Sequence, residues 1–166
     1  MVYSDADILH KVENGELFTE GFKKENLGPC SYDLTADTVC FSDGTERELP
    51  WIVRPKEFII IKTKEAISIP NDIIGRIVER NSVMRFGLQV SGPVYQPGHK
   101  TKIFLRVFNM TWNKVKIEGD FEIAQIIFEQ LESPPIHPYP KTGTFQNEME
   151  YRGLGRYKDT FKRMKV

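Results

Sequence analysis

Apolar and polar residues alternate with a period of two along much of the chain, which is typical of β-strands with one buried face. The alternation begins after Gly28 and Pro29, where residues 31–35 read Ser-Tyr-Asp-Leu-Thr. Later segments are rich in Ile, Val, Phe and Thr, and turn-forming residues separate them. We therefore predict strands at residues 31–35, 37–41, 57–63, 75–79, 84–90, 102–110, 114–118 and 122–131.

Many short strands at short spacing predict a mainly β fold, a sandwich or barrel of jelly-roll type. One helix is predicted ahead of them. Ser4 is a suitable N-cap, acidic residues in the first turn suit the helix dipole, and Asn14 with Gly15 supplies a stop. Residues 5–13 are therefore expected to form a short amphipathic helix that packs on the β domain.

Prolines at positions 134, 135, 138 and 140 mark the end of the strand pattern, because proline cannot donate to a sheet ladder. We predict a β domain at residues 1–133 and a C-terminal arm with a basic tail at residues 134–166. The segment from Arg156 to Val166 contains five basic residues and one acidic residue, Asp159. The tail is either a solvated terminus or an arm that closes over the ligand of a neighbouring subunit.

Composition and charge limit the partners. The 166 residues are enough for one domain with a sizeable core. Lys plus Arg and Asp plus Glu are both 23, so no bulk attraction to nucleic acid or to an anionic membrane is expected. Two cysteines, no apolar run of about 18 residues and no signal-peptide pattern predict a cytoplasmic protein that does not span a membrane.

Three segments carry a resemblance to a known family. They are Leu27–Thr35 (LGPCSYDLT), Glu79–Arg85 (ERNSVMR) and Val94–Lys100 (VYQPGHK). Together they resemble the dCTP deaminase and dUTPase family, and the likeness extends over roughly residues 3–155. The resemblance implies a dUTPase-like jelly-roll or β-barrel subunit in a homotrimer, with dCTP or dUTP bound at the subunit boundaries and Mg²⁺ held mostly by the phosphates. It implies deamination of dCTP to dUTP or cleavage of dUTP to dUMP.

The resemblance places phosphate binding at residues 80–85. Arg80 and Arg85 supply cations, and Asn81 and Ser82 supply short neutral donors, a combination that suits phosphate oxygens. Glu79 stands where the family has a glycine, and it could pair with Arg80 or Arg85. The alternative is a plain strand with alternating surface charges.

Other nucleotide contacts follow from the same resemblance. Tyr95 would stack on the deoxyribose, and Gln125 would lie buried beside the ligand. The segment that contains Tyr151, Arg152 and Gly153 resembles the glycine-bearing C-terminal segment that closes over the triphosphate.

Both positions where the family has a catalytic carboxylate hold other residues. Gln96 stands at the place of the Asp that activates water in dUTPases, and Arg106 at the place of the proton-shuttling Glu of the deaminases. A neutral amide has no useful basicity, and arginine stays protonated, so neither can take up a proton. Arg106 could instead grip phosphate or pair with Glu122.

His99, three residues after Gln96, is the natural substitute base, although an exposed turn histidine is the simpler interpretation. Glu148 and Glu150 could also be brought in by a flexible arm. Cys30 and Cys40 are ten residues apart, so no protein-bound metal is assigned. Three hypotheses remain open: an active enzyme, a catalytically silent binding or regulatory module, and a scaffold without nucleotide affinity.

Overall fold

The computed structural model describes residues 1–165, so Val166, the last residue of the predicted arm, lies outside the described part. The helices are α1 (Asp5–Glu13), α2 (Asn81–Phe86), α3 (Tyr139–Thr142) and α4 (Lys158–Lys162), with 3₁₀ turns η1 (Lys24–Asn26) and η2 (Gly155–Tyr157). The strands are β1 (Leu17–Glu20), β2 (Leu27–Gly28), β3 (Ser31–Cys40), β4 (Glu46–Glu48), β5 (Trp51–Val53), β6 (Phe58–Ser68), β7 (Ile73–Glu79), β8 (Leu88–Ser91), β9 (Val94–Tyr95), β10 (Lys100–Asn109), β11 (Val115–Ile117) and β12 (Glu122–Gln130).

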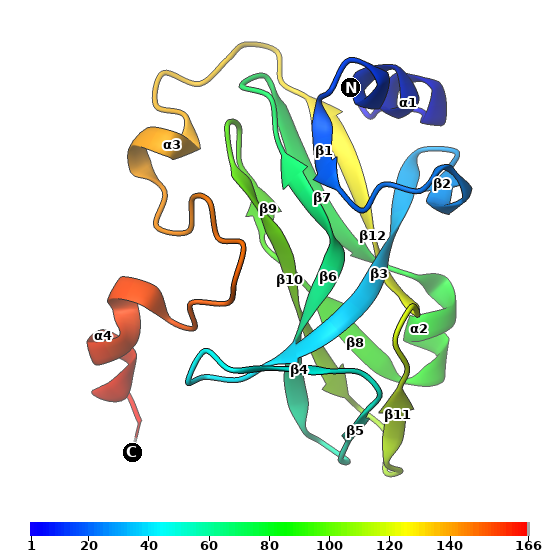
Figure 1. Cartoon of the computed structure of the whole chain (residues 1–166), viewed down its shortest axis with the longest axis vertical. Coiled ribbons are helices and arrows are strands. Elements are labelled where there is room, and N and C mark those ends of the chain that lie inside the picture. Colours follow the sequence, from blue (N-terminus) through cyan, green and yellow to red (C-terminus); the bar gives the residue numbers. More distant parts are fainter. Residues whose placement is uncertain (166) are drawn as a thin grey trace.

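Within residues 1–165, most strands join one antiparallel sheet in the order β8-β10-β6-β3-β12-β7-β9. Strand β1 is added to β6, β2 and β4 are added to β3, and β5 pairs with β11 in a small second sheet. The two ends of the order, β8 and β9, are consecutive in sequence and only Gly92 and Pro93 separate them. The sheet therefore curls until its ends come near each other, and Figure 1 shows the long strands β3, β6 and β10, which are neighbours in the sheet, through its middle.

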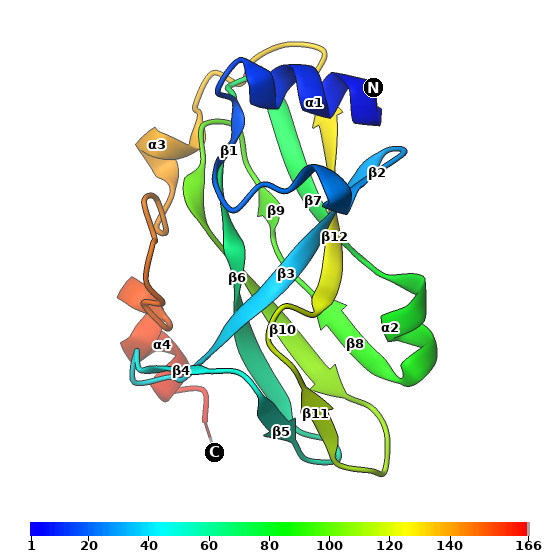
Figure 2. The same cartoon turned by 45° about the vertical axis from the view of Figure 1, so that its right-hand side comes forward.

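The core lies inside this curled sheet. Along β10, Ile103, Leu105 and Val107 are fully buried, while Phe104 and Arg106 point to the other face. Helix α1 docks through Ile8, which is also fully buried, and Figure 2 shows it across one end of the sheet. Among the helices of residues 1–165, none has the length and apolar composition needed to cross a membrane.

The predicted mainly β fold with a short N-terminal helix is confirmed, and the helix has the predicted bounds. The segments 31–35 and 37–41 form one strand, β3. The strand predicted at 84–90 is wrong, because residues 81–86 form helix α2 and strand β8 begins only at Leu88. Gly87, with a φ of +94°, ends the helix in the left-handed conformation that glycine adopts without strain.

Candidate functional site

Arg80 lies between β7 and α2, at the N-cap of the helix. Its guanidinium forms ion pairs with Asp33 Oδ2 (2.9 Å) and Glu122 Oε2 (2.9 Å), and it donates to the Glu122 carbonyl oxygen (3.0 Å). These partners come from β3 and β12, so Arg80 connects two neighbouring strands to the start of the helix. The alternative of a strand with alternating surface charges is wrong, because the segment turns into a helix at Asn81.

Gln125 belongs to the same polar group. Its Nε2 donates to Asp33 Oδ1 at 2.8 Å and to Ser31 Oγ at 3.3 Å. Ser31, Asp33, Arg80, Glu122 and Gln125 therefore form one hydrogen-bonded set, called here the Arg80 cluster. Asp33 binds both Arg80 and Gln125, and these contacts fix the two side chains before any ligand arrives.

The other residues of the predicted phosphate segment are less constrained. Asn81, Ser82 and Arg85 are exposed on α2, and Arg85 Nε donates to Asn81 Oδ1 at 2.9 Å. The alternative in which Glu79 pairs with Arg80 or Arg85 is wrong, because its Oε1 accepts from the backbone N–H of Val90 at 2.8 Å. Among the described residues, no carboxylate forms an ion pair with Arg85, so its charge faces solvent.

The turn between β9 and β10 holds Gln96 and His99. Gln96 is exposed, whereas His99 is only 6% exposed, so its interpretation as an exposed turn histidine is wrong. The C-terminal segment covers the ring: Nε2 lies 3.0 Å from the carbonyl oxygen of Phe145, and Tyr139 stacks on it with centroids 3.9 Å apart. Nδ1 is buried and has no hydrogen-bond partner within residues 1–165. Burial lowers the pKa of His99, which favours the neutral ring.

Residues 139–152, called here the strap, run along the β9–β10 hairpin. Asn147 N–H donates to the Lys100 carbonyl at 2.8 Å, and Lys102 N–H donates to the Glu148 carbonyl at 2.9 Å. Glu148 is only 5% exposed, and its Oε1 accepts from the backbone N–H of Arg152 at 2.8 Å. Burial raises the pKa of the Glu148 carboxyl group.

The hairpin and the strap enclose a cavity of about 280 Å³. Gln96, His99 and Glu148 supply polar groups, and Tyr95, which is nearly fully buried, supplies one aromatic wall. We call this space the hairpin cavity; it is lined by Pro93, Val94, Tyr95, Gln96, His99, Thr101, Lys102, Phe104, Tyr139, Phe145 and Glu148.

Arg106 lies on β10 directly opposite Ser91 of β8, and its side chain is exposed. It lines a second, open cavity together with Ile60, Ser91, Gly92, Pro93, Phe104 and Tyr151. None of the described residues that line this cavity is a carboxylate. Of the two alternatives for Arg106, the pair with Glu122 is wrong, because β12 does not neighbour β10 and Glu122 is bound to Arg80.

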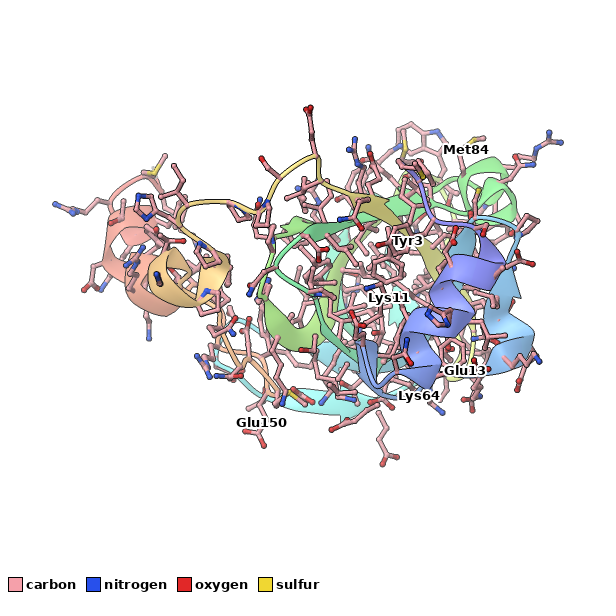
Figure 3. All side chains as sticks on the ribbon, turned by 90° about the horizontal axis from the view of Figure 1, so that it is seen from above. Tyr3, Lys11, Glu13, Lys64, Met84 and Glu150 are labelled. Atoms are coloured by element: carbon pink, nitrogen blue, oxygen red, sulfur yellow. The ribbon has the colours of Figure 1, made fainter. Side chains whose placement is uncertain are left out.

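The predicted site residues fall into two separate groups. Arg80, Arg85 and the rest of α2 lie on one side of the sheet, and the strap with α3 and α4 lies on the other, as both Figure 1 and Figure 2 show. Figure 3 gives the same result from above, where Met84 of α2 and Glu150 of the strap lie at opposite sides. Gln96, His99, Tyr95 and Arg106 belong to the strap side, as do Tyr151, Arg152 and Gly153.

Two parts of the site were missed. Tyr139 lies between Pro138 and Pro140, after the strand pattern has ended, and nothing in its sequence neighbourhood signals that its ring covers His99. Asp33 lies inside the segment that carried the resemblance, but its role as the partner of Arg80 depends on a contact across the sheet. The available signal was a carboxylate on the polar side of an alternating strand, although Ser31 and Thr35 share that side.

The sequence of the chain is similar to those of known proteins of one family. The model of the family described as dCTP deaminase-like matches residues 44–131. A dCTP deaminase of Pyrococcus horikoshii is 31% identical over 135 residues, which cover 79% of this chain and 85% of that protein. A dUMP-forming dCTP deaminase of Nocardioides sp. is 28% identical over 176 residues, which cover 92% and 91% of the two chains.

Solved structures agree in fold. A 2'-deoxycytidine 5'-triphosphate deaminase from Agrobacterium tumefaciens superimposes with a TM-score of 0.64 at 15% identity, over 78% of this chain and 48% of that one, about half its length. A mutant dUTPase from phage phi11 of S. aureus gives a TM-score of 0.54 at 15% identity, over 71% and 86% of the chains. On the sequence matches, with a fold that agrees, the chain belongs to the dCTP deaminase-like family.

Proposed function

We propose that this protein binds a pyrimidine deoxynucleoside triphosphate, dCTP or dUTP, in nucleotide metabolism, and that it does so without the water-activating step of a deaminase or a dUTPase. The relatives named as dCTP deaminases support the ligand class. The chemistry of the two catalytic positions supports the absence of that step.

The observation that carries the proposal is the setting of Gln96 and Arg106. Gln96 is an exposed amide, and Arg106 lies in a cavity that no described carboxylate lines. Removing a positioned general base commonly costs about 10²–10⁴ in rate. The guanidinium of Arg106 can attract an anion, so the position is better suited to holding a ligand than to removing a proton from water.

Arg85 is the strongest candidate for contact with the phosphates. Its charge faces solvent, and Asn81 and Ser82 lie beside it on α2. Arg80 is already bound by two carboxylates, so its main contribution is to hold α2 in place. Within residues 1–165 no cluster of three or more His, Cys, Asp or Glu side chains could hold a metal ion. We infer that Mg²⁺ would bind through the phosphates, where it offsets their charge.

A homotrimer fits this division of the site. Helix α2 carries Arg85, and the strap borders the hairpin cavity. The helix and the strap lie on opposite sides of one chain, so a single copy does not bring the two parts together. If copies associate side by side, α2 of one copy can lie beside the hairpin of the next and complete the site. The arm predicted at residues 134–166 would then border the same junction.

The proposal is tested with full-length protein incubated with dCTP or dUTP and Mg²⁺. Thermal shift and calorimetry measure binding, and chromatography with a pyrophosphate assay measures turnover. Arg85→Ala is expected to weaken triphosphate binding, while Arg54→Ala, which removes another exposed arginine, is the matched control. Turnover at a rate typical of enzymes would contradict the proposal, and so would the absence of binding to any nucleotide, which would favour the scaffold.

Turnover at the same site is a second candidate function, and one observation favours it. Glu148 is a carboxylate that lines the hairpin cavity together with Gln96, and burial raises its pKa, which makes it a stronger base than an exposed carboxylate. In that case Glu148→Gln would abolish product formation, and Glu150→Gln on the same strap would not.

A further inference from the structure

A group of large apolar side chains is exposed at the end of the molecule opposite helix α1. Strands β5 and β11, the start of β6 and the loop from β10 to β11 meet there, as Figure 1 and Figure 2 show. We call residues 52–58 and 109–114 the tip. Its exposed apolar residues are Ile52, Phe58, Met110 and Trp112, the last with an exposed fraction of 83%. Exposed apolar residues scattered singly are ordinary, whereas a group of them on adjoining segments indicates an interaction surface.

Hydrogen bonds hold the two segments of the tip together. The side chain of Asn109 is fully buried, and its Nδ2 contacts three backbone carbonyl oxygens. They belong to Val53 (3.1 Å), Arg54 (3.1 Å) and Asn113 (2.8 Å). Trp112 therefore stands on an ordered loop, and little conformational entropy would be lost when a partner covers it.

Lys56 has a strained backbone conformation in the turn from β5 to β6. Its φ of +60° lies in the left-handed region, which lysine rarely occupies and which costs stability. In this conformation its Nζ donates to the Met110 carbonyl and lies 4.3 Å from the centroid of the Trp112 ring, within the range of a cation–π interaction. Glycine would form the same turn without the strain. A lysine at this position is therefore better explained by its side chain on the surface than by the fold.

The charge of the tip is mostly positive. Arg54, Lys56 and Lys114 are exposed, and none of them forms an ion pair within residues 1–165. The single acid in the sequence of the tip, Glu57, accepts from the backbone N–H of Arg54 at 2.7 Å. Three unpaired cations around an exposed aromatic ring attract a partner of negative charge.

We propose that the tip is a docking surface for an acidic segment of another protein, which places an apolar side chain against Trp112 and its carboxylates near the three cations. Tryptophan, phenylalanine, methionine and arginine, all present in the tip, are the residue types enriched in protein interfaces. One face of the Trp112 ring is covered by Lys56, so a nucleic-acid base has less aromatic surface to stack on than a bare ring would offer.

This surface is separate from the nucleotide site. The tip contributes no residue to the lining of the hairpin cavity or to the Arg80 cluster. Variants of the tip should therefore bind dCTP as the unmodified protein does, and the two proposals can fail independently.

The test measures the fluorescence anisotropy of three labelled peptides of nine residues, mixed with the full-length protein. The first has the core Leu-Phe-Leu between two runs of glutamate, the second has the same core between runs of lysine, and the third has Ser-Gly-Ser between runs of glutamate. Only the first is expected to bind well, with an affinity that falls as NaCl is added. The other two should bind at least about tenfold more weakly.

Two variants test the tip directly. Trp112→Ala should weaken binding of the first peptide at least about tenfold, because the aromatic anchor is lost. Ile136→Ala, which removes an apolar side chain of similar exposure (85%) outside the tip, is the matched control and should stay within about twofold. Equal affinity in Trp112→Ala and the unmodified protein would overturn the inference.

Lys56→Gly separates a role in binding from a role in the fold. It relieves the strained turn, so Tm should stay within about 2 °C of the unmodified protein or rise, while affinity for the first peptide should fall at least about threefold. A lower Tm with unchanged peptide affinity would show that lysine serves the fold at this position, and it would overturn the inference.

A second measurement needs no variant. The indole N–H resonances of Trp112 and Trp51 are followed while the first peptide is added. Trp51 packs edge-on against Phe41 with ring centroids 5.4 Å apart and serves as the internal control. A shift at Trp112 alone is expected, and a shift at neither tryptophan would refute docking at the tip. Binding to single-stranded DNA or to vesicles of phosphatidylcholine and phosphatidylserine, with none to the peptides, would overturn the choice of a protein partner.

Discussion

Arg80→Ala is expected to destabilise the fold, because Arg80 acts as a clamp between β3, β12 and α2. Its side chain is 24% exposed, and those of Asp33 and Glu122 are 19% and 44% exposed. Hydrogen bonds to charged groups contribute about 1.5–3 kcal/mol, but exposed ion pairs contribute only about 0.2–1 kcal/mol. The shielded pair with Asp33 therefore dominates, and we expect a total loss of about 1–3 kcal/mol.

The assay is thermal and urea unfolding of the variant beside Arg85→Ala. For a chain of this size, about 1 kcal/mol corresponds to a Tm change of about 2–4 °C, so Arg80→Ala should lower Tm by about 2–12 °C. Arg85 is bonded to Asn81 alone among the side chains of residues 1–165, so Arg85→Ala should lower Tm by less than about 2 °C.

A double-mutant cycle isolates the clamp itself. The coupling energy between Arg80 and Asp33 should be about 1 kcal/mol and should exceed that between Arg80 and Glu122. A Tm of Arg80→Ala that matches the unmodified protein, or a coupling near zero for both pairs, would refute the clamp. Arg80 would then be free to serve as the main phosphate ligand.

Three further predictions concern catalysis, pH and the core. Gln96→Asp and Arg106→Glu should each supply a carboxylate where the resemblance places the catalytic one. Product formation from dUTP or dCTP should then rise by up to about 10²–10⁴-fold if the new carboxylate is well placed. Unchanged product formation would mean that the pocket differs from those of active enzymes in other ways. The pKa of His99 is below its usual value in the folded protein, so the unfolded chain binds the proton more tightly, and the stability present above about pH 6.5 should fall as the pH drops below that value. In His99→Gln this part of the decrease in Tm with falling pH should be lost. A profile of Tm against pH that is identical in the variant and the unmodified protein would contradict the prediction. Glu65 is fully buried, and both of its oxygens lie 3.1 Å from the N–H of Thr35, so Glu65→Ala should cost about 1–3 kcal/mol in urea unfolding, while Glu65→Gln, which keeps an acceptor, should cost less.

The elements that could be predicted from sequence are those fixed by local signals. Helix α1 has the predicted bounds, because the capping box of Ser4 and Asp7 and the stop at Asn14 lie within the segment itself. The alternation of residues 102–110 separates Arg106 from the buried Ile103, Leu105 and Val107, as the structure shows. Helix α2 was missed, because it has six residues and buries only Val83, so it has no clear helical period.

The contacts of the candidate site depend on distant parts of the chain. Arg80 is bound by Asp33 and Glu122, which belong to strands that become neighbours only when the sheet forms. His99 is buried by a strap whose contact residue, Phe145, lies 46 residues further along. Sequence spacing carries no information on such pairs without the topology of the sheet. The division of the chain at residue 133 and the roles assigned to the site residues stay predictions.

The central claim is that the protein holds the nucleotide but does not convert it. Equilibrium dialysis with labelled dCTP and Mg²⁺, followed by chromatography of the retained nucleotide, tests both halves of that claim in one sample. Saturable retention is expected, with recovery of the label as dCTP after prolonged incubation and the corresponding result for dUTP. Recovery of the label as dUTP or dUMP from dCTP, in an amount that depends on protein concentration, would contradict it.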